Sequence, residues 1–226
     1  MRIGIIGCGR IGSTAARLFL AAGHEVAIAN SRGLERLCGL VAELGDRARA
    51  ATVDAAGSFG EMVLVAIPFQ RYRELPAATL AKKIVIDAMN YYPGGEGDFP
   101  ELDDGEVTSS ELLAAHLPDA KVVKAFNTMH WQLLRDRGRP DGGDGRLALF
   151  VAGDDPDAKD RVSHLIEEVG FAPVDSGGLA PGARRQQPGA PIYTELARRR
   201  REGRDPPGFT ERDAESALLT AGSGSR

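Results

Sequence analysis

Three glycines near the start of the chain have the residue type and spacing that point most directly to chemistry. Gly7, Gly9 and Gly12 form the pattern G-x-G-x-x-G, directly after the apolar residues 3–6. The first glycine permits a tight strand-to-helix turn, the second lets the backbone approach a pyrophosphate, and the third lets the next helix pack on the strand. Arg10 and Ile11 lie inside the pattern, where the free N–H groups of a new helix would face phosphates. The pattern predicts a dinucleotide site at these five residues.

The elements on both sides of the pattern support this interpretation. An apolar strand precedes it, an amphipathic helix is expected over 11–22, and a second strand over 25–29. The alternative is a glycine-rich turn in an α/β protein that binds no nucleotide. This order of strand, turn, helix and strand argues against it.

The end of the second expected strand bears on which dinucleotide is bound. NAD sites place Asp or Glu about 20 residues on, where the carboxylate accepts from the ribose 2′-OH and would repel a 2′-phosphate. This chain has Asn30 and Ser31 there, followed by Arg32 and Arg36. A guanidinium suits a phosphate, so we expect NADP(H), with these four residues at its 2′-phosphate end. The alternative is that both arginines are solvated surface charges.

Composition excludes several classes of partner. The 226 residues include 28 Lys and Arg against 32 Asp and Glu, a net charge of −4, so nothing suggests nucleic acid or an anionic membrane as partner. No apolar run approaches the roughly 18 residues that span a bilayer, and the N-terminus is a strand rather than a signal peptide, so we expect a cytoplasmic protein. Cys8 and Cys38 have no metal-binding spacing, and we expect no metal site.

Strands and helices alternate along the rest of the N-terminal part. Further strands are expected over 48–52, 62–67, 83–87 and 121–126. The run 62–67 is apolar without interruption, which is typical of a central parallel strand buried on both faces. Thr108 and Glu111 have the spacing of a capping box, which predicts a helix there. This order predicts an α/β fold with a doubly wound parallel sheet, a Rossmann domain over residues 1–127.

The carboxyl ends of the strands are where such a sheet binds its ligand. Asn90 and Asn127 follow two of the strands and could orient a carboxamide or a second ring, although asparagine also makes turns. The loop 91–106, with six acidic residues, is either a lid or a disordered surface segment. Together with the glycine pattern, the strand ends predict a cofactor site at Ile67, Pro68, Asn90, Asn127, Thr128 and Met129.

The pattern changes after residue 127. Thr128 is expected to cap a helix, and two further strands flank a helix capped by Asp155, which makes a small α/β segment over 128–181. That segment is too short for a core of its own, so we expect it to pack on the first domain. Residues 182–226 form a polar, arginine-rich tail, expected to be partly disordered. The four arginines 198–201 are either a solvated face or an anion site.

Several segments spread over most of the chain are distinctive: MRIGIIG (1–7), GHEV (23–26), NSRG (30–33), AIP (66–68), IDAMN (86–90), VVKAFNT (122–128), VAGDD (151–155) and FAPVDSG (171–177). In these segments the chain resembles one family, the NADPH-dependent reductases of the deazaflavin coenzyme F-420. The N-terminal unit is also similar to the cytosolic domain of membrane ferric reductases, which use NADPH to reduce a flavin.

The resemblance implies roles for several residues. Ser31 and Arg32 would hold the 2′-phosphate of NADP(H), and Pro68 with residues 127–129 would line a cleft for nicotinamide and deazaflavin. It also implies a homodimer, and hydride transfer to or from coenzyme F-420 as a small redox co-substrate.

Hydride transfer between two rings needs placement within about 3–3.5 Å, and water can supply any further proton, so we expect no catalytic side chain. The alternative acceptors are a flavin, a ferric chelate, or a small carbonyl or imine. A carbonyl or imine would need a proton donor, for which Lys124 and His130 are the candidates. A protein that senses NADPH without catalysis is the remaining alternative.

Overall fold

The computed structural model describes residues 1–31, 33–95, 97, 99–142, 145–204 and 208–222. Within these residues one sheet has eight strands, in the order β3-β2-β1-β4-β5-β6-β7-β8. β7 pairs antiparallel with β6, whereas the other neighbouring strands run parallel. The predicted α/β fold with a doubly wound, mostly parallel sheet is confirmed. The strands are β1 (Arg2–Ile6), β2 (Glu25–Ala29), β3 (Ala48–Ala51), β4 (Met62–Val65), β5 (Ile84–Asp87), β6 (Lys121–Lys124), β7 (Ala148–Gly153) and β8 (Ala172–Asp175).

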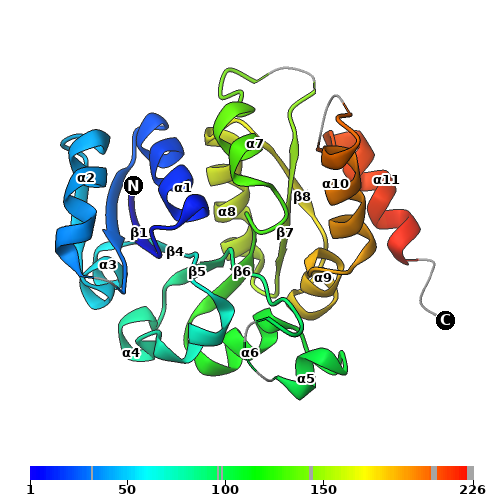
Figure 1. The fold of residues 1–226 in the computed structure, drawn as a ribbon, viewed down its shortest axis with the longest axis horizontal. Helices are drawn as coiled ribbons and strands as arrows, with labels where there is room; N and C mark the ends of the chain where they lie inside the picture. Colours follow the sequence, from blue (N-terminus) through cyan, green and yellow to red (C-terminus); the bar gives the residue numbers. More distant parts are fainter. Residues whose placement is uncertain (32, 96, 98, 143–144, 205–207, 223–226) are drawn as a thin grey trace.

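Helices cover both faces of this sheet (Figure 1). Alternate strand residues such as Leu64 and Val65 point to opposite faces and join two separate apolar cores, as expected of strands buried on both sides. One core holds α1 (Arg10–Ala21), α7 (Trp131–Asp136) and α8 (Pro156–Glu168) on the sheet. The other holds η2 (Phe69–Glu74), α4 (Ala77–Leu80), α6 (Ser109–His116) and α9 (Leu179–Gln186). The remaining helices are η1 (Leu34–Leu37), α2 (Cys38–Leu44), α3 (Val53–Phe59), α5 (Pro100–Asp103), α10 (Pro191–Arg201) and α11 (Glu211–Gly222).

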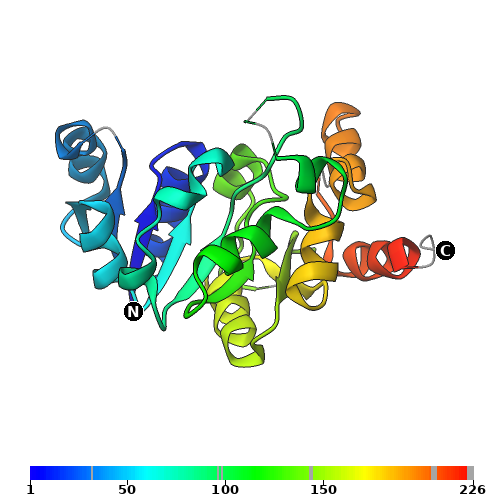
Figure 2. The same cartoon turned by 90° about the horizontal axis from the view of Figure 1, so that it is seen from below.

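The C-terminal α/β segment packs on the first domain by extending its sheet. Val123 of β6 pairs with Gly153 of β7, and Lys124 pairs with Ala152. Further along the chain, α10 and α11 lie beyond β7 and β8, at the end of the molecule away from α2 (Figures 1 and 2). Helix α10 supplies one wall of the site described below.

The described part of the expected polar tail contains two helices, α10 and α11, and the end of α9, none of which sequence analysis predicted. Ile192, Phe209 and Ala214 are buried with Phe150 of β7 in a small apolar cluster, which holds α10 and α11 against the sheet. These apolar residues are separated by arginines and glutamates, so the sequence shows no continuous apolar stripe. Residues 205–207 and 223–226 of the tail lie outside the described part of the chain.

Two of the three predicted helix caps are confirmed. Thr108 and Glu111 form a capping box at α6, and Asp155 caps α8 by accepting from the Ala158 N–H. The prediction for Thr128 was wrong, because α7 starts later and His130 is its N-cap. Phe126 has a positive φ of 64°, so the chain turns after β6 before it can enter a helix.

The described part of the loop 91–106 is held against the first domain. Phe99 is 8% exposed and packs edge-on against Phe69, with ring centroids 5.3 Å apart. The Tyr91 hydroxyl donates to Asp103 at 2.8 Å, within the same loop. Glu96 and Asp98 lie outside the described residues. In the described part of the chain, none of the helices combines the length and the apolar character needed to cross a bilayer.

Candidate cofactor and acceptor site

The glycine turn has the geometry that a dinucleotide-binding turn requires. Gly7 has φ +111°, and a Cβ there would lie 2.3 Å from the Ala66 carbonyl oxygen. A Cβ on Gly12 would lie 1.8 Å from the Gly7 carbonyl oxygen, so only glycine lets α1 pack this closely on the turn. At Gly9, by contrast, a Cβ would meet no described atom within 4 Å. The open side of Gly9 fits a pyrophosphate that approaches the backbone.

The N-terminus of α1 adds a second feature that suits phosphate. Gly9 is its N-cap, so no side chain caps the helix among the described residues, and its first turn has no acidic residue. The first N–H groups of a helix have no partner within the helix and carry its positive dipole end. Arg10 and Ile11 therefore present backbone donors to whatever lies over Gly9.

A small cavity of about 50 Å³ lies on the β2 side of this turn. Of the predicted residues, Gly7, Asn30, Ser31 and Ile67 line it. Its wall also includes a pair that sequence analysis missed, Arg71 and Glu74 of η2, which form an ion pair. The described residues that line it are Ile6, Gly7, Asn30, Ser31, Val53, Ile67, Arg71, Glu74 and Leu75. We call this the adenosine-side cavity.

Besides Gly9 and Gly12 of the turn, three predicted residues line neither cavity or lie outside the described part of the chain. Arg36 is exposed on η1 and does not line the adenosine-side cavity. Pro68 is exposed directly before η2 and lines neither cavity. Arg32, the proposed 2′-phosphate ligand, lies outside the described residues, so its role stays a prediction.

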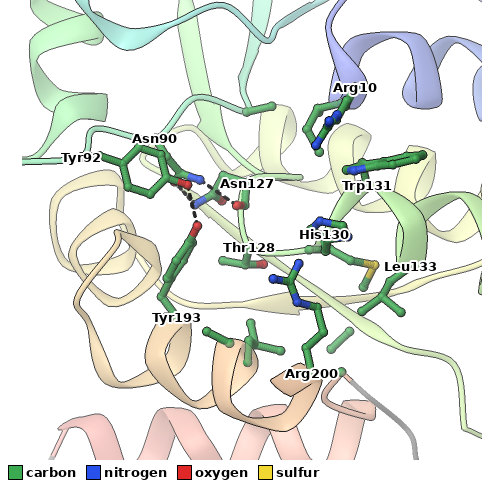
Figure 3. A pocket seen from close by; sticks show the side chains of 17 residues that line it. Arg10, Asn90, Tyr92, Asn127, Thr128, His130, Trp131, Leu133, Tyr193 and Arg200 are labelled. Atoms are coloured by element: carbon green, nitrogen blue, oxygen red, sulfur yellow. Dashed lines mark hydrogen bonds between the residues drawn. The ribbon is translucent and has the colours of Figure 1, made fainter. Parts of the chain in front are cut away.

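A larger cavity of about 370 Å³ lies on the other side of the turn, over the carboxyl ends of β5 and β6 (Figure 3). We call it the acceptor-side cavity. It brings together the predicted residues Arg10, Ile11, Asn90, Asn127, Thr128 and Met129. The other lining residues are Ala88, Tyr92, His130, Trp131, Leu133, Ala148, Tyr193, Leu196, Ala197, Arg200 and Gly208.

Asn90 and Asn127 form a bonded pair in the wall of this cavity. Asn90 Nδ2 donates to the Asn127 carbonyl oxygen at 2.9 Å, and Asn127 Nδ2 donates to Asn90 Oδ1 at 3.1 Å and to the Gln186 carbonyl oxygen at 3.1 Å. Asn127 is only 6% exposed, yet its Oδ1 has no hydrogen-bond partner among the described residues. A buried acceptor without a partner is costly, and a ligand amide or ring N–H would satisfy it.

A buried ion pair holds the strand ends beneath this pair. Lys124 Nζ donates to Asp87 Oδ2 at 3.1 Å and also to the Met89 carbonyl oxygen. The two oxygens of Asp87 further accept from the Met89 N–H at 2.9 Å and the Ser110 hydroxyl at 2.7 Å. Lys124 does not line the cavity, so this candidate proton donor for a carbonyl or imine is wrong.

His130 and Trp131 form the wall opposite the asparagines, together with Arg10. The Arg10 guanidinium lies over the Trp131 ring, 5.6 Å from its centroid. Burial lowers the pKa of His130, and the positive charges of Arg200 and Arg10 lower it further. Its imidazole is therefore neutral near pH 7 and makes a weak proton donor.

Helix α10 supplies the third wall, which sequence analysis missed. Tyr193 and Tyr92 hydrogen-bond through their hydroxyls at 2.7 Å, which joins α10 to the chain after β5. Burial and this bond raise the pKa of Tyr193, so it too makes a poor acid. The signal was in the sequence: Tyr193, Leu196, Ala197 and Arg200 have the spacing i, i+3, i+4, i+7 of one helix face.

No cluster of three or more metal-ligating side chains occurs in the portion of the chain covered by the structure.

Comparisons with known proteins agree with this geometry. Residues 2–91 match the sequence profile of the family described as NADP oxidoreductase, coenzyme F-420-dependent. A solved structure from Arthrobacter sp. FB24, provisionally assigned as an F-420-dependent NADP reductase, is 30% identical, with TM-score 0.66, over 79% of this chain and 85% of that one. The chain belongs to the coenzyme F-420-dependent NADP oxidoreductase family.

Two further relatives show how much of the chain the similarity covers. Hypothetical protein SMa0349 from Sinorhizobium meliloti is 36% identical, with TM-score 0.73, over 84% of this chain and 92% of that one. Metalloreductase STEAP3 of Rattus norvegicus is 32% identical over 181 residues, 79% of this chain. The chain spans only 34% of the length of that metalloreductase. The predicted family is confirmed, and it is one of NADP-dependent oxidoreductases.

Proposed function

We propose that this protein transfers hydride between NADP(H) and a deazaflavin, coenzyme F-420. The observation that carries the proposal is the acceptor-side cavity, which adjoins the glycine turn and has room for a second ring beside a nicotinamide. Its volume of about 370 Å³ is within the range of small-molecule sites. Family membership supports the choice of partners.

The residues of the site suit a reaction that needs placement rather than proton transfer. Bound NADPH supplies a hydride, which a deazaflavin ring accepts at carbon with one further proton from water. Asn127 Oδ1 is available to accept from a carboxamide or ring N–H, and Met129, Trp131 and Leu133 offer apolar contact to ring faces. Fixing two rings about 3–3.5 Å apart is catalysis by proximity and orientation.

The second candidate is an NADPH-dependent reductase of a flavin or ferric chelate. Its support is the 32% identity to a metalloreductase over most of this chain. A carbonyl or imine reductase is less well supported, because Lys124 is sequestered and both His130 and Tyr193 are poor acids. A protein that only senses NADPH would not need an open cavity beside the nicotinamide position.

Stopped-flow mixing separates these candidates. Protein loaded with NADPH is mixed with oxidised coenzyme F-420, riboflavin or ferric citrate, and the decay of NADPH absorbance is followed. We expect the deazaflavin to be reduced fastest. If the flavin or the chelate is faster, the second candidate replaces the first; if none reacts faster than without protein, both fail.

Cofactor choice is tested at the end of β2. We expect Arg32→Asp to weaken NADPH binding at least tenfold more than NADH binding, because a carboxylate repels the 2′-phosphate and accepts from a 2′-hydroxyl. Arg36→Asp is the matched control, since Arg36 does not line the adenosine-side cavity. Equal losses for both cofactors in the Arg32 variant would contradict the assignment.

A further inference from the structure

The acceptor-side cavity has an uneven charge. Among the described residues, its lining includes the two arginines Arg10 and Arg200, together with His130, but neither Asp nor Glu. Figure 3 shows Arg200 rising from α10 toward Thr128 and His130, while Arg10 faces the same space from the other wall. Burial is the main cause of the lowered pKa of His130, and both guanidinium charges lower it further because they disfavour a third positive charge nearby.

The arginine run at the end of α10 divides into residues with and without a carboxylate. Arg198 bonds Glu195 and Glu202, and Arg199 bonds Glu195 and Asp213. Arg200 has no ion pair with any described carboxylate, although Arg198 and Arg199, directly before it in the chain, both do. It is the arginine of the run that lines the cavity.

Arg10, on the opposite wall, also has no described carboxylate within ion-pair distance. Its guanidinium lies over the face of the Trp131 ring. Its backbone lies on the first turn of α1, beside Gly9, where the free N–H groups of the helix would face the cofactor phosphates. Arg200 lies across the cavity, on a helix that sequence analysis did not connect with the cofactor, and so is the charge left for a second ligand.

We propose that Arg200 binds a phosphate or carboxylate of the electron acceptor, so that the acceptor-side cavity selects an anionic co-substrate. This inference rests on the proposed function, because it describes the acceptor of that reaction. Guanidinium donors suit both anions, and none of the described lining residues is an acid that would repel them. Such a cavity disfavours an iminium ion, which is positive, and favours a deazaflavin or flavin phosphate or a polycarboxylate chelate.

Matched ligands that differ only in their charge test this assignment. The NADP⁺-loaded protein is titrated with FMN and riboflavin, and with 5-deaza-FMN and 5-deazariboflavin, by fluorescence quenching. Phosphate and citrate serve as competitors that show which anion fits. The proteins are the wild type, Arg200→Gln, and the control Arg201→Gln, in which the next arginine is exposed and does not line the cavity.

We expect each phosphate-bearing ligand to bind about 10-fold tighter than its neutral counterpart, which is typical of one charge-assisted contact. That preference should fall with added salt and disappear in Arg200→Gln, with NADP⁺ affinity and melting temperature unchanged. Arg201→Gln should resemble the wild type.

Three results would overturn the inference. Charged and neutral ligands could bind equally to the wild type, Arg200→Gln could keep the preference, or Arg200→Gln could weaken NADP⁺ instead, which would assign the arginine to the cofactor. Failure of the proposed function looks different: anionic ligands would bind with the Arg200-dependent preference, yet none would be reduced. If none of the four ligands binds, both proposals fail.

Discussion

The two cavities beside the glycine turn are built in opposite ways. The adenosine-side cavity is small, about 50 Å³, and the described residues that line it lie within the first 75 positions of the chain. The acceptor-side cavity is larger, about 370 Å³, and gathers side chains from Arg10 to Gly208. The first depends on local sequence around β1, β2 and β4, and the second on how distant segments pack. The two cavities therefore share one turn but depend on different parts of the chain.

The largest effect is expected where the acceptor side depends on a long-range contact. Lys124→Met leaves Asp87 charged and fully buried, and the Met89 carbonyl loses a donor. Removing one partner of a buried pair costs about 3–5 kcal/mol, measured as the free energy of unfolding in urea. Where the variant is still folded, acceptor binding should weaken more than binding of 2′,5′-ADP, which probes only the adenosine side.

Lys121→Met on the same strand is the control. Its ion pair with Asp155 is exposed to solvent, with side chains 45% and 33% accessible, so the expected loss is below about 1 kcal/mol. Equal losses for the two variants would show that the buried pair does not hold the acceptor side.

A smaller effect is expected at the turn that both cavities share. Gly12→Ala places a Cβ 1.8 Å from the Gly7 carbonyl oxygen, so α1 must shift away from β1. Such overpacking costs about 1–3 kcal/mol of stability, and NADPH affinity should fall together with 2′,5′-ADP affinity. The comparison of the two variants then separates damage to one cavity from damage to both.

Gly39→Ala in α2 is the matched control for this change. A Cβ there meets no described atom within 4 Å, so alanine should stabilise the helix by about 0.5–1 kcal/mol. If Gly12→Ala is as stable as Gly39→Ala and binds NADPH normally, the close packing at the turn is not required.

The difference between the cavities also explains what sequence could predict. Gly7, Asn30, Ser31 and Ile67 lie beside one another because parallel strands end at one edge of a sheet, which a pattern of strands and helices predicts. Tyr193 and Arg200 reach the acceptor side only because α10 packs beyond β7. The helical spacing of these residues can be read in the sequence, but the packing on β7 that brings α10 to the acceptor side cannot. The homodimer, the cytoplasmic location and the domain boundaries stay predictions.

The smallest effect is expected in the pKa of His130, which reports the electrostatic field inside the acceptor-side cavity. Arg200→Gln removes one of the two positive charges that lower the pKa of His130, so this pKa should rise toward the ordinary value of 6.5 in an NMR titration of the ring protons. In the wild type the unfolded chain binds this proton more readily than the folded one. Stability is therefore lost as the pH falls below about 6.5 toward the folded pKa, and the variant should lose less. His24 is an internal control, because its pKa is lowered mainly by burial and neither Arg10 nor Arg200 contributes. An unchanged pKa of His130, or an equal pKa shift at His24, would show that the Arg200 guanidinium does not act on groups in the cavity.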